Sequence, residues 1–307
     1  LSRGLGDVYK RQIYYSPDYL CEGYGVDTRE KAADIAASFL DRPIAGIQVV
    51  SPEAATSDEV ARVHKRRYIN ALLTGRPDSL ADANGMGDWS TDLRRSVFSM
   101  VGGCIASARD SYLNNMNSGS LSSGLHHARA GHGSGFCTLN GLAIAARDVL
   151  IQGAQRVLII DLDAHGGGGT ASLIEGVAGI EQIDVSVNGF DNYEDTSNAR
   201  LVRSSGETYI HDVKQLLASV VDPSSIDLVI YNAGMDPHED CSTGGSAGIT
   251  TDVLAQREKL VFEWAGQHGV PVSFVLAGGY SGRKLSRAQL VDLHRLTIQE
   301  AVGVWLE

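Results

Sequence analysis

Apolar residues in this chain follow two patterns that alternate from one end to the other. Short runs that are apolar at every position, such as VLII and FVL, are typical of strands buried on both faces of a parallel sheet. They predict strands at 46–50, 156–162, 182–187, 226–231 and 271–276. Apolar residues spaced three or four apart predict helices at 28–41, 57–74, 91–114, 139–152, 206–221, 251–268 and 286–306. This alternation favours an α/β fold, a single three-layer domain with a mainly parallel sheet.

The length of 307 residues allows one large domain or two small ones, and the regular alternation favours one. Residues 1–12 fit neither pattern, and we expect a non-native or disordered leader there, followed by one domain at 13–307. No apolar run approaches the length of about 18 residues that a membrane helix needs, and the start lacks the apolar core of a signal peptide. The four cysteines are widely spaced, which predicts a reducing compartment, the cytoplasm.

Charge and glycine content narrow the choice of partner. The formal net charge of −11 disfavours binding to nucleic acid or to an anionic membrane, whereas a cationic substrate is compatible with it. Glycine accounts for 35 of the 307 residues, about 11% against roughly 7% in average proteins. This excess predicts loops in which backbone segments approach each other closely.

Acidic and histidine side chains follow two of the predicted strands, where a parallel sheet forms its ligand crevice. Side chains alternate along a strand, so Asp161, Asp163 and His165 share one face. Asp236, after the strand at 226–231, reaches the same edge. Asp163, His165 and Asp236 offer three ligands and an open position, which is typical of a catalytic zinc or iron site. The alternative is a helix-capping aspartate beside a histidine whose hydrogen bonds are satisfied.

The glycines at 166–169 raise the different possibility of a phosphate-binding loop. Neither the spacing G-x-G-x-x-G nor G-x-x-x-x-G-K-[ST] fits this segment, and Asp163 would repel a phosphate. We therefore disfavour nucleotide binding.

Two further groups have side chains suited to catalysis. His126 and His127 lie in the glycine-rich segment GLHHA, and histidine has the pKa that a general base for water needs. The alternative is a pair of surface histidines. Tyr280 ends the segment AGGY, and its hydroxyl could donate to an oxyanion, although a glycine followed by an aromatic residue is often only a strand end.

Together these segments are similar to a known family. GLHHA, GFCTLN, VLIIDLDAHGGGGT, IDVSV, NAGMDPHED and AGGY, in this order, resemble the histone deacetylase superfamily, which includes bacterial acetylpolyamine amidohydrolases and acetoin-utilisation proteins. The likeness runs from about residue 13 to the end. It implies an arginase-like α/β fold and a zinc hydrolase that cleaves N-acetyl amides, with Fe²⁺ as a second candidate metal. The implied substrates are an acylated lysine peptide or an acetylated polyamine.

The resemblance implies roles for single residues. Asp163, His165 and Asp236 match the zinc ligands, and His126 and His127 match the tandem histidines that transfer protons. In the implied mechanism zinc holds the amide carbonyl and a water. His127 takes the proton of that water, and the histidine pair later protonates the leaving amine.

Other matches concern the surroundings of the reaction. Asp161 matches the carboxylate that orients the first histidine, and Tyr280 the phenol that polarises the carbonyl. Gly135 and Phe136 match one wall of a narrow acyl-lysine channel.

Three further matches concern a cation site, a rim residue and the second channel wall. Ser186 and Val187 resemble part of a structural site for K⁺ or Na⁺, and Asp88 matches a rim aspartate that grips substrate backbone. The opposite channel wall falls within 188–195, with Tyr193 as one candidate.

One departure from the family pattern concerns His127. The position that usually holds a carboxylate or amide behind the second histidine is Gly168. We expect His127 to lack its usual partner, to have a shifted pKa or to use water instead. This leaves open a catalytically weak or inactive domain that binds acylated ligands or a partner. A manganese-dependent, arginase-like ureohydrolase is a further alternative on the same fold, and the sequence leaves the oligomeric state open.

Overall fold

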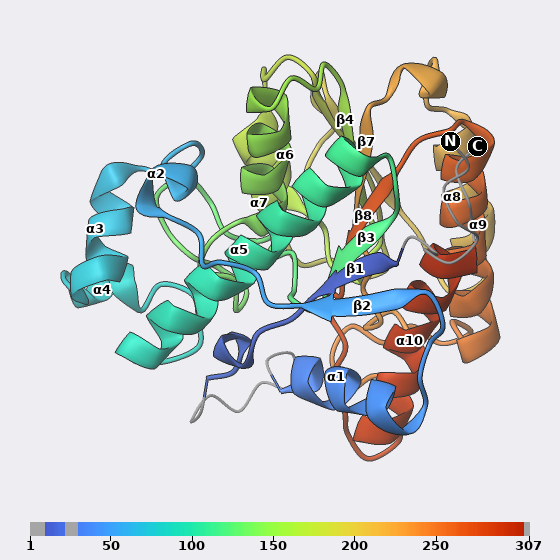
Figure 1. The fold of residues 1–307 in the computed structure, drawn as a ribbon, viewed down its shortest axis with the longest axis horizontal. Coiled ribbons are helices and arrows are strands. Elements are labelled where there is room, and N and C mark those ends of the chain that lie inside the picture. Colours follow the sequence, from blue (N-terminus) through green and yellow to red (C-terminus); the bar gives the residue numbers. More distant parts are fainter. Residues whose placement is uncertain (1–9, 22–29, 304–307) are drawn as a thin grey trace, which may run out of the picture.

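The protein forms one eight-stranded sheet in which every pair of neighbouring strands is parallel. The computed structural model describes residues 10–21 and 30–303 (Figure 1). The strand order is β2-β1-β3-β8-β7-β4-β5-β6. The strands are β1 (Arg11–Tyr14), β2 (Ile47–Val50), β3 (Ser118–Ser120), β4 (Val157–Asp161), β5 (Ile180–Ser186), β6 (Ala199–Arg203), β7 (Leu228–Asn232) and β8 (Val272–Val275).

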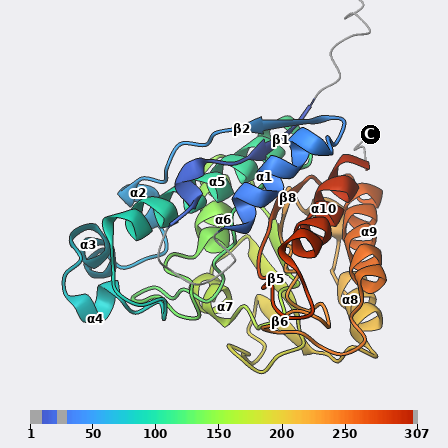
Figure 2. The ribbon, with the colours of Figure 1, turned by 90° about the horizontal axis from the view of Figure 1, so that it is seen from below.

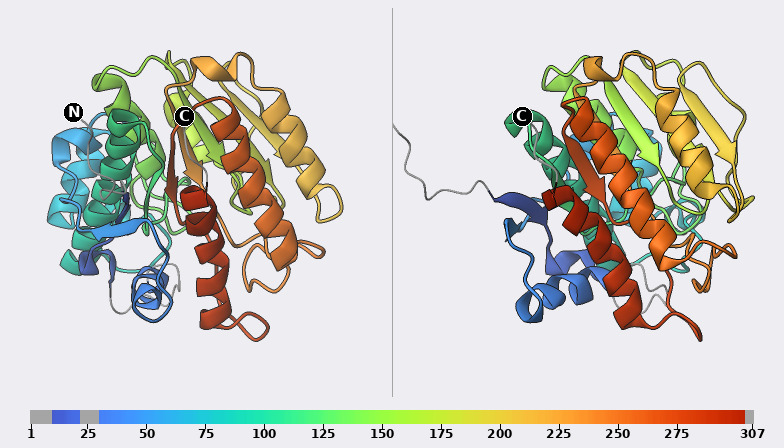
Figure 3. Two further views of the ribbon diagram at one scale, coloured as in Figure 1. Left: turned by 45° about the vertical axis from the view of Figure 1, so that its right-hand side comes forward. Right: turned by 90° about the vertical axis from the view of Figure 1, so that its right-hand side faces the viewer.

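Helices cover both faces of the sheet, which makes the three layers of the predicted α/β fold. Figure 3 shows α8, α9 and α10 against one face, with α5 and α6 on the other. Side chains of β4 alternate between these layers, because Ile159 packs with α6 and Ile160 belongs to the larger core on the other side. The helices beside the sheet are α1 (Lys31–Asp41), α5 (Thr91–Asn114), α6 (Gly141–Ile151), α7 (Gly168–Ile174), α8 (Tyr209–Ala218), α9 (Thr251–Gln267) and α10 (Arg287–Gly303).

Three short helices form an extension at one end of the molecule, opposite α8 to α10 (Figure 2). They are α2 (Ser57–Val60), α3 (Arg66–Thr74) and α4 (Asp78–Ala81). The sequence predicted one helix at 57–74, and this is wrong. The buried His64 lies between α2 and α3, where its ring bonds to the Arg129 carbonyl and accepts from the Asn140 amide. The next amide, Lys65, donates to the Ala130 carbonyl at 2.7 Å and not to a helical partner. Two 3₁₀ turns, Pro17–Tyr19 and Pro223–Ser225, complete the regular elements of residues 10–21 and 30–303.

The apolar pattern located five strands and missed β1, β3 and β6. The sequence of β3, SGS, is small and polar because the strand passes under an aromatic ring: a Cβ at Gly119 would lie 2.1 Å from the ring of Phe274. Strand β1 includes Arg11 and Gln12, so the leader predicted at 1–12 is wrong at these two residues. Residues 1–9 of it lie outside the described residues.

The centre of the sheet brings three loops to one edge. In the register of the ladder, Asp161 at the end of β4 is opposite Asn232 of β7, and Asn232 is opposite Val275 of β8. The three strands therefore end side by side at the same edge of the sheet, and the loops that follow them start next to each other. No helix among residues 10–21 and 30–303 is both long and apolar enough to cross a membrane.

Candidate active site

Three side chains with metal-binding atoms meet at the carboxyl ends of β4 and β7. Asp163 and His165 follow β4, and Asp236 lies in the loop after β7. One ligand atom of each lies within 4.8 Å of the others. His165 Nδ1 is 3.1 Å from Asp163 Oδ1 and 3.1 Å from Asp236 Oδ2. The structure thus brings the three expected metal ligands together.

The donor set and its surroundings fit a divalent cation. The backbone amides of Gly278 and Ala164 donate to Asp163 Oδ2 and Asp236 Oδ1, each at 3.0 Å. Asp236 Oδ2 is buried and has no hydrogen bond of its own from the described residues, since His165 Nδ1, 3.1 Å away, is shared with Asp163 Oδ1. This is a costly state for a carboxylate oxygen unless a cation binds it. A Cβ at position 278 would lie 2.3 Å from that oxygen, so the glycine keeps the space between the carboxylates open. Two carboxylates and one imidazole suit zinc or iron.

Charges in this cluster shift the pKa values of its members in opposite directions. Burial and the nearby charge of Asp163 raise the pKa of Asp236 to about 6. The neighbouring imidazoles, His126 foremost, hold the pKa of Asp163 well below its usual range, although burial acts in the opposite sense. Burial lowers the pKa of His165, but its hydrogen bonds to Asp163 and Asp236 outweigh this and raise it to about 10. The two carboxylates thus favour positive charge between them.

Two adjacent histidines lie beside the cluster, with ring centroids 3.9 Å apart. His126 Nδ1 donates to Asp161 Oδ2 at 2.8 Å, and His127 Nδ1 donates to Asp191 Oδ2 at 2.9 Å. An ionised carboxylate only accepts hydrogen bonds, so both rings carry a proton on Nδ1. Asp161 is fixed in turn by Asn232, whose amide donates to Asp161 Oδ1 at 2.8 Å.

The pKa values of the two histidines move apart. Burial lowers the pKa of His126, but the charges of Asp161 and Asp163 outweigh it and raise that pKa to about 10. Burial and the charge of His126 lower the pKa of His127 to about 4. One ring is therefore cationic and the other neutral near pH 7, an arrangement that separates an acid from a base.

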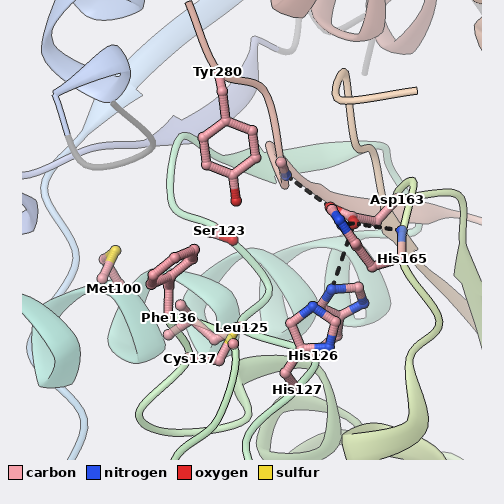
Figure 4. Close-up of a pocket in the computed structure, with 12 residues that line it drawn as sticks. Met100, Ser123, Leu125, His126, His127, Phe136, Cys137, Asp163, His165 and Tyr280 are labelled. Atoms are coloured by element: carbon pink, nitrogen blue, oxygen red, sulfur yellow. Dashed lines mark hydrogen bonds and ion pairs between the residues drawn. The ribbon is translucent and has the colours of Figure 1, made fainter. Parts of the chain in front are cut away.

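Asp163, His165 and the two adjacent histidines line an inner cavity of about 30 Å³, which Tyr280 also lines. Figure 4 shows the phenol of Tyr280 pointing into this pocket, across from the two histidines. An outer hollow of about 550 Å³ shares His127, Gly135, Phe136, His165 and Tyr280 with the inner cavity. The two spaces thus form one path from the surface to the expected metal ligands, and the inner part has room for a group the size of a water or an acetyl.

A family model described as histone deacetylase domain matches residues 27–295, most of the chain. The chain belongs to the histone deacetylase family. An uncharacterized protein of Picosynechococcus sp. is 32% identical over 76% of this chain and 79% of its own length. The acetoin utilization protein AcuC of Staphylococcus aureus is 36% identical, over 40% of this chain and 34% of its own length.

Solved structures show the same fold. A crystal structure of acetylpolyamine aminohydrolase from Burkholderia pseudomallei superposes with a TM-score of 0.77 and 19% sequence identity, and covers 96% of this chain and 99% of its own. The predicted arginase- and deacetylase-like α/β fold is therefore confirmed.

The departure from the histone deacetylase pattern at Gly168 has a structural counterpart. His127 does lack the partner that the family pattern places at position 168, and Asp191 supplies a carboxylate from a different loop instead. A Cβ at position 168 would lie 2.7 Å from Asp191 Oδ1 and 2.5 Å from the Asp191 carbonyl oxygen. The absence of a side chain at 168 is what leaves room for Asp191. The expectation that the pKa of His127 is shifted agrees with the lowering described above.

Two phenylalanines line the outer hollow. Phe136, expected in the channel wall, and Phe190 are both partly exposed there. The Phe190 ring stands edge-on to His127, with centroids 4.9 Å apart. Gly135 lies between them, since a Cβ there would come within 2.6 Å of the His127 ring and 2.8 Å of the Phe190 ring. The outer hollow thus has two aromatic walls.

Sequence reasoning limited the second wall to 188–195 without choosing the residue. Tyr193 does not line the pocket, because its hydroxyl accepts a hydrogen bond from Gln182 Nε2 at 2.9 Å and donates to the Arg200 carbonyl. Phe190 lines the outer hollow instead, and its aromatic type was the one available signal. Asp191 was missed because nothing in the sequence pairs it with a histidine 64 positions away.

Ser186 and Val187 lie beside the segment that carries the metal ligands, and the Val187 amide donates to the Ala164 carbonyl at 3.0 Å. The Ser186 hydroxyl contacts the Asn188 carbonyl and Asn192 Oδ1. The K⁺ or Na⁺ site stays a prediction.

Asp88 is not among the residues that line the inner cavity or the outer hollow. The turn before it is closed by Asp82, which accepts a hydrogen bond from the Trp89 amide. Asp88 lines a separate hollow with Arg76 and Arg94. Its contact with substrate backbone stays a prediction.

Proposed function

We propose that this protein is a zinc-dependent amidohydrolase that removes an acetyl or other acyl group from an N-acylated amine. Acyl-lysine in a peptide and acetylpolyamine are the two substrate classes. Membership of the histone deacetylase family supports the reaction class. The structural relative named acetylpolyamine aminohydrolase supports a small acetylated amine as substrate.

The observation that carries the proposal is the gathering of six side chains at one inner cavity, which five of them line while Asp236 completes the metal-binding group behind it. Three of them, Asp163, His165 and Asp236, form a metal-binding group. The other three, His126, His127 and Tyr280, face the same space. An amide hydrolase needs an electrophile for the carbonyl, a base for water and an acid for the leaving amine, and this cavity has a candidate for each.

A zinc ion held by Asp163, His165 and Asp236 would polarise the amide carbonyl and lower the pKa of a water molecule. His127, neutral and protonated on Nδ1, accepts the proton of the attacking water at Nε2. The Tyr280 hydroxyl donates to the oxyanion as the tetrahedral intermediate develops, and its raised pKa keeps it protonated for this. His126, cationic beside Asp161, donates the proton that the leaving amine takes up.

The outer hollow supports a substrate with a long, thin arm. Phe136 and Phe190 line this hollow, and a methylene chain such as that of lysine or a polyamine would pack against the two rings. The net charge of −11 accords with a basic peptide or a polyamine.

Two alternatives lose their support. A domain that binds acylated ligands without turnover rested on the missing partner of His127, and Asp191 provides one. A ureohydrolase with two metal ions needs a second ligand cluster, and the described residues contain a single group of three or more metal-binding side chains.

A substrate panel tests the proposal. Zinc-loaded protein is incubated with acetyl-lysine, longer acyl-lysine and trifluoroacetyl-lysine peptides and with acetylpolyamines, with and without a chelator. We expect hydrolysis of at least one substrate class, loss of activity with the chelator and recovery with zinc. Metal analysis of the protein before zinc loading distinguishes zinc from iron.

Two variants complete the test. Tyr280→Phe removes the oxyanion donor, and we expect kcat to fall on the order of 10²-fold. Asp236→Ala removes a metal ligand and should abolish both metal binding and turnover. Glu194→Gln, at a side chain that is 93% exposed, serves as the control. Hydrolysis at the normal rate in both Tyr280→Phe and Asp236→Ala would refute the mechanism.

A further inference from the structure

The loop at 188–193 lies directly on the four-glycine segment 166–169. The Gly166 amide donates to the Phe190 carbonyl at 3.0 Å, and the Gly168 amide donates to the Asp191 carbonyl at 3.1 Å. A Cβ would lie 2.7 Å from the Asp191 carbonyl oxygen at position 166 and 2.5 Å from it at position 168. Only glycines allow this approach, so the backbone of the 188–193 loop packs directly on the backbone of the glycine segment.

Both carboxylate oxygens of Asp191, in this loop, accept hydrogen bonds from neighbouring segments. Its Oδ2 accepts from His127 Nδ1 at 2.9 Å and from the Gly169 amide at 3.0 Å. Its Oδ1 accepts from Arg129 Nη2, and Arg129 Nη1 reaches the Gly168 carbonyl at 2.9 Å. Both oxygens are thus satisfied, and the carboxylate is held on two sides.

The backbone of Asp191 is in a region that most residues avoid. Its φ is +54°, which aspartate, asparagine and glycine tolerate better than other residues. The polar contacts described above hold this strained conformation, and in it the carboxylate meets the His127 ring.

We infer that Asp191 is the positioning residue of His127. It keeps the proton on Nδ1, so that the lone pair of Nε2 is available in the pocket, where no hydrogen bond from the described residues occupies that nitrogen. The carboxylate comes from the 188–193 loop. In the family pattern the carboxylate would stand at position 168, which is a glycine in this chain. The inference rests on the proposed function for the claim that His127 accepts a proton, whereas the tautomer of His127 is independent of that claim.

The position of Asp191 also connects the base to the channel wall. Its neighbour Phe190 packs edge-on against both His127 and His165, with centroids 4.9 and 6.0 Å apart. One short loop therefore holds a ring that borders the substrate path and the carboxylate that orients the proton acceptor. Their effects on kinetics should separate, because only Asp191 acts on a group that transfers a proton.

The experiment uses two variants chosen for the positive φ. Asp191→Gly removes the carboxylate and adopts φ = +54° freely. Asp191→Asn keeps an acceptor oxygen for Nδ1 without the charge, and asparagine tolerates the same backbone. Glu194→Gln, three residues along the chain, removes one negative charge at a side chain that is 93% exposed and serves as the matched control.

The first readout is the tautomer of His127, measured in the metal-free protein from the ¹⁵N shifts of the histidine rings. A His127→Gln variant assigns the signals. We expect the Nδ1–H form in the wild type and in Asp191→Asn, and a mixture with the Nε2–H form in Asp191→Gly. The Nδ1–H form undiminished in Asp191→Gly would overturn the inference.

The second readout is the separation of kcat from KM in the zinc-loaded protein with the best substrate of the panel. We expect kcat to fall on the order of 10–100-fold in Asp191→Gly with KM within about threefold, and partial rescue in Asp191→Asn. A loss confined to KM, or equal losses in Glu194→Gln, would also overturn it.

If the wild type hydrolyses no amide, the proposed function fails, and the tautomer measurement still decides the role of Asp191. If Asp191→Gly does not fold, the folded Asp191→Asn decides: its kcat must be lowered, and an unchanged kcat contradicts the inference.

Discussion

Arg257 and Glu258 form an ion pair from which water is wholly excluded, and the pair lies under the two loops that hold the expected metal ligands. Arg257 Nε donates to Glu258 Oε1 at 2.8 Å, and neither side chain is exposed. Arg257 Nη1 donates to the carbonyls of Leu162 and Gly234, at 3.1 and 2.7 Å. Leu162 precedes Asp163, and Gly234 lies two residues before Asp236. One guanidinium from α9 therefore connects the two loops.

Replacing one member of this pair should be costly. We expect Arg257→Met to lower the free energy of unfolding by about 3–5 kcal/mol, because Glu258 is left charged and buried while two carbonyls lose their donor. The measurement is urea unfolding at pH 7. Arg257→Met/Glu258→Leu should recover much of the loss, since an apolar pair leaves no buried charge.

The control is the surface pair Arg203–Glu194, whose side chains are 60% and 93% exposed. Arg203→Met should cost less than about 1 kcal/mol. In a folded Arg257→Met protein we also expect zinc affinity to fall on the order of 10–100-fold, measured by chelator competition. Zinc affinity equal to that of the wild type would show that the guanidinium does not hold the ligand loops.

The stability of the protein should fall in mild acid because of His64. This side chain is 3% exposed, its Nδ1 donates to the Arg129 carbonyl, and its Nε2 accepts from the Asn140 amide, both at 2.9 Å. Protonation of Nε2 would break the second bond. Burial lowers the pKa of His64 to about 4, so the unfolded chain takes up the proton first.

His64 therefore contributes full stability above its unfolded pKa of about 6.5, and this is lost as the pH falls towards 4, by about 3 kcal/mol. His64→Gln, which keeps a donor and an acceptor but does not titrate, should lack this loss. Urea unfolding between pH 7 and pH 4.5 gives the free energy of unfolding of both proteins. The difference between wild type and variant isolates the contribution of His64, because the other titrating groups cancel. A difference that stays constant with pH would contradict the assignment.

A methyl group at position 168 should disturb the 188–193 loop. Gly168→Ala places a Cβ within 2.5 Å of the Asp191 carbonyl oxygen, which is backbone and cannot swing away. We expect a loss of about 1–3 kcal/mol in unfolding free energy and a lower kcat. Gly189→Ala is the matched control in the same loop, because a Cβ there meets nothing within 4 Å. Equal effects of the two substitutions would show that the close contact at 168 is unimportant.

The parts of the site that could be predicted from the sequence are local. Asp161, Asp163 and His165 alternate on one strand end, and Asp236 follows a neighbouring strand, so strand geometry alone brings them to one edge. Asp191 could not be predicted in this way, because it reaches His127 from an irregular loop and through a positive φ. The strand β3 was missed for a similar reason, since its central Gly119 leaves room for the ring of Phe274 from the neighbouring strand.

The glycine excess has a physical explanation that the sequence did not contain. Each of the glycines at 166–169 lies against a part of the site: Gly166 and Gly168 against the Asp191 backbone, Gly167 against Asp161 Oδ2, and Gly169 against the backbone of His126 and His127. The sequence indicated close approach, but which segments meet there is a property of the tertiary fold.

Removing the ring of Phe190 should weaken substrate binding more than catalysis. Phe190 is 46% exposed and borders the outer hollow, so a methylene chain in the channel loses one apolar wall in Phe190→Ala. We expect KM for an acetyl-lysine peptide to rise roughly tenfold, which corresponds to about 1–2 kcal/mol of lost apolar contact, while kcat changes less than about threefold. Steady-state kinetics on zinc-loaded protein measures both constants. Leu40→Ala, at a side chain that is 87% exposed in α1, should change neither. Because Phe190 and Asp191 are adjacent, this variant and Asp191→Gly disturb the same loop, and a common effect of loop disorder would lower kcat in both. A rise in KM for one and a fall in kcat for the other is the pattern that separates a wall of the channel from the residue that orients the base.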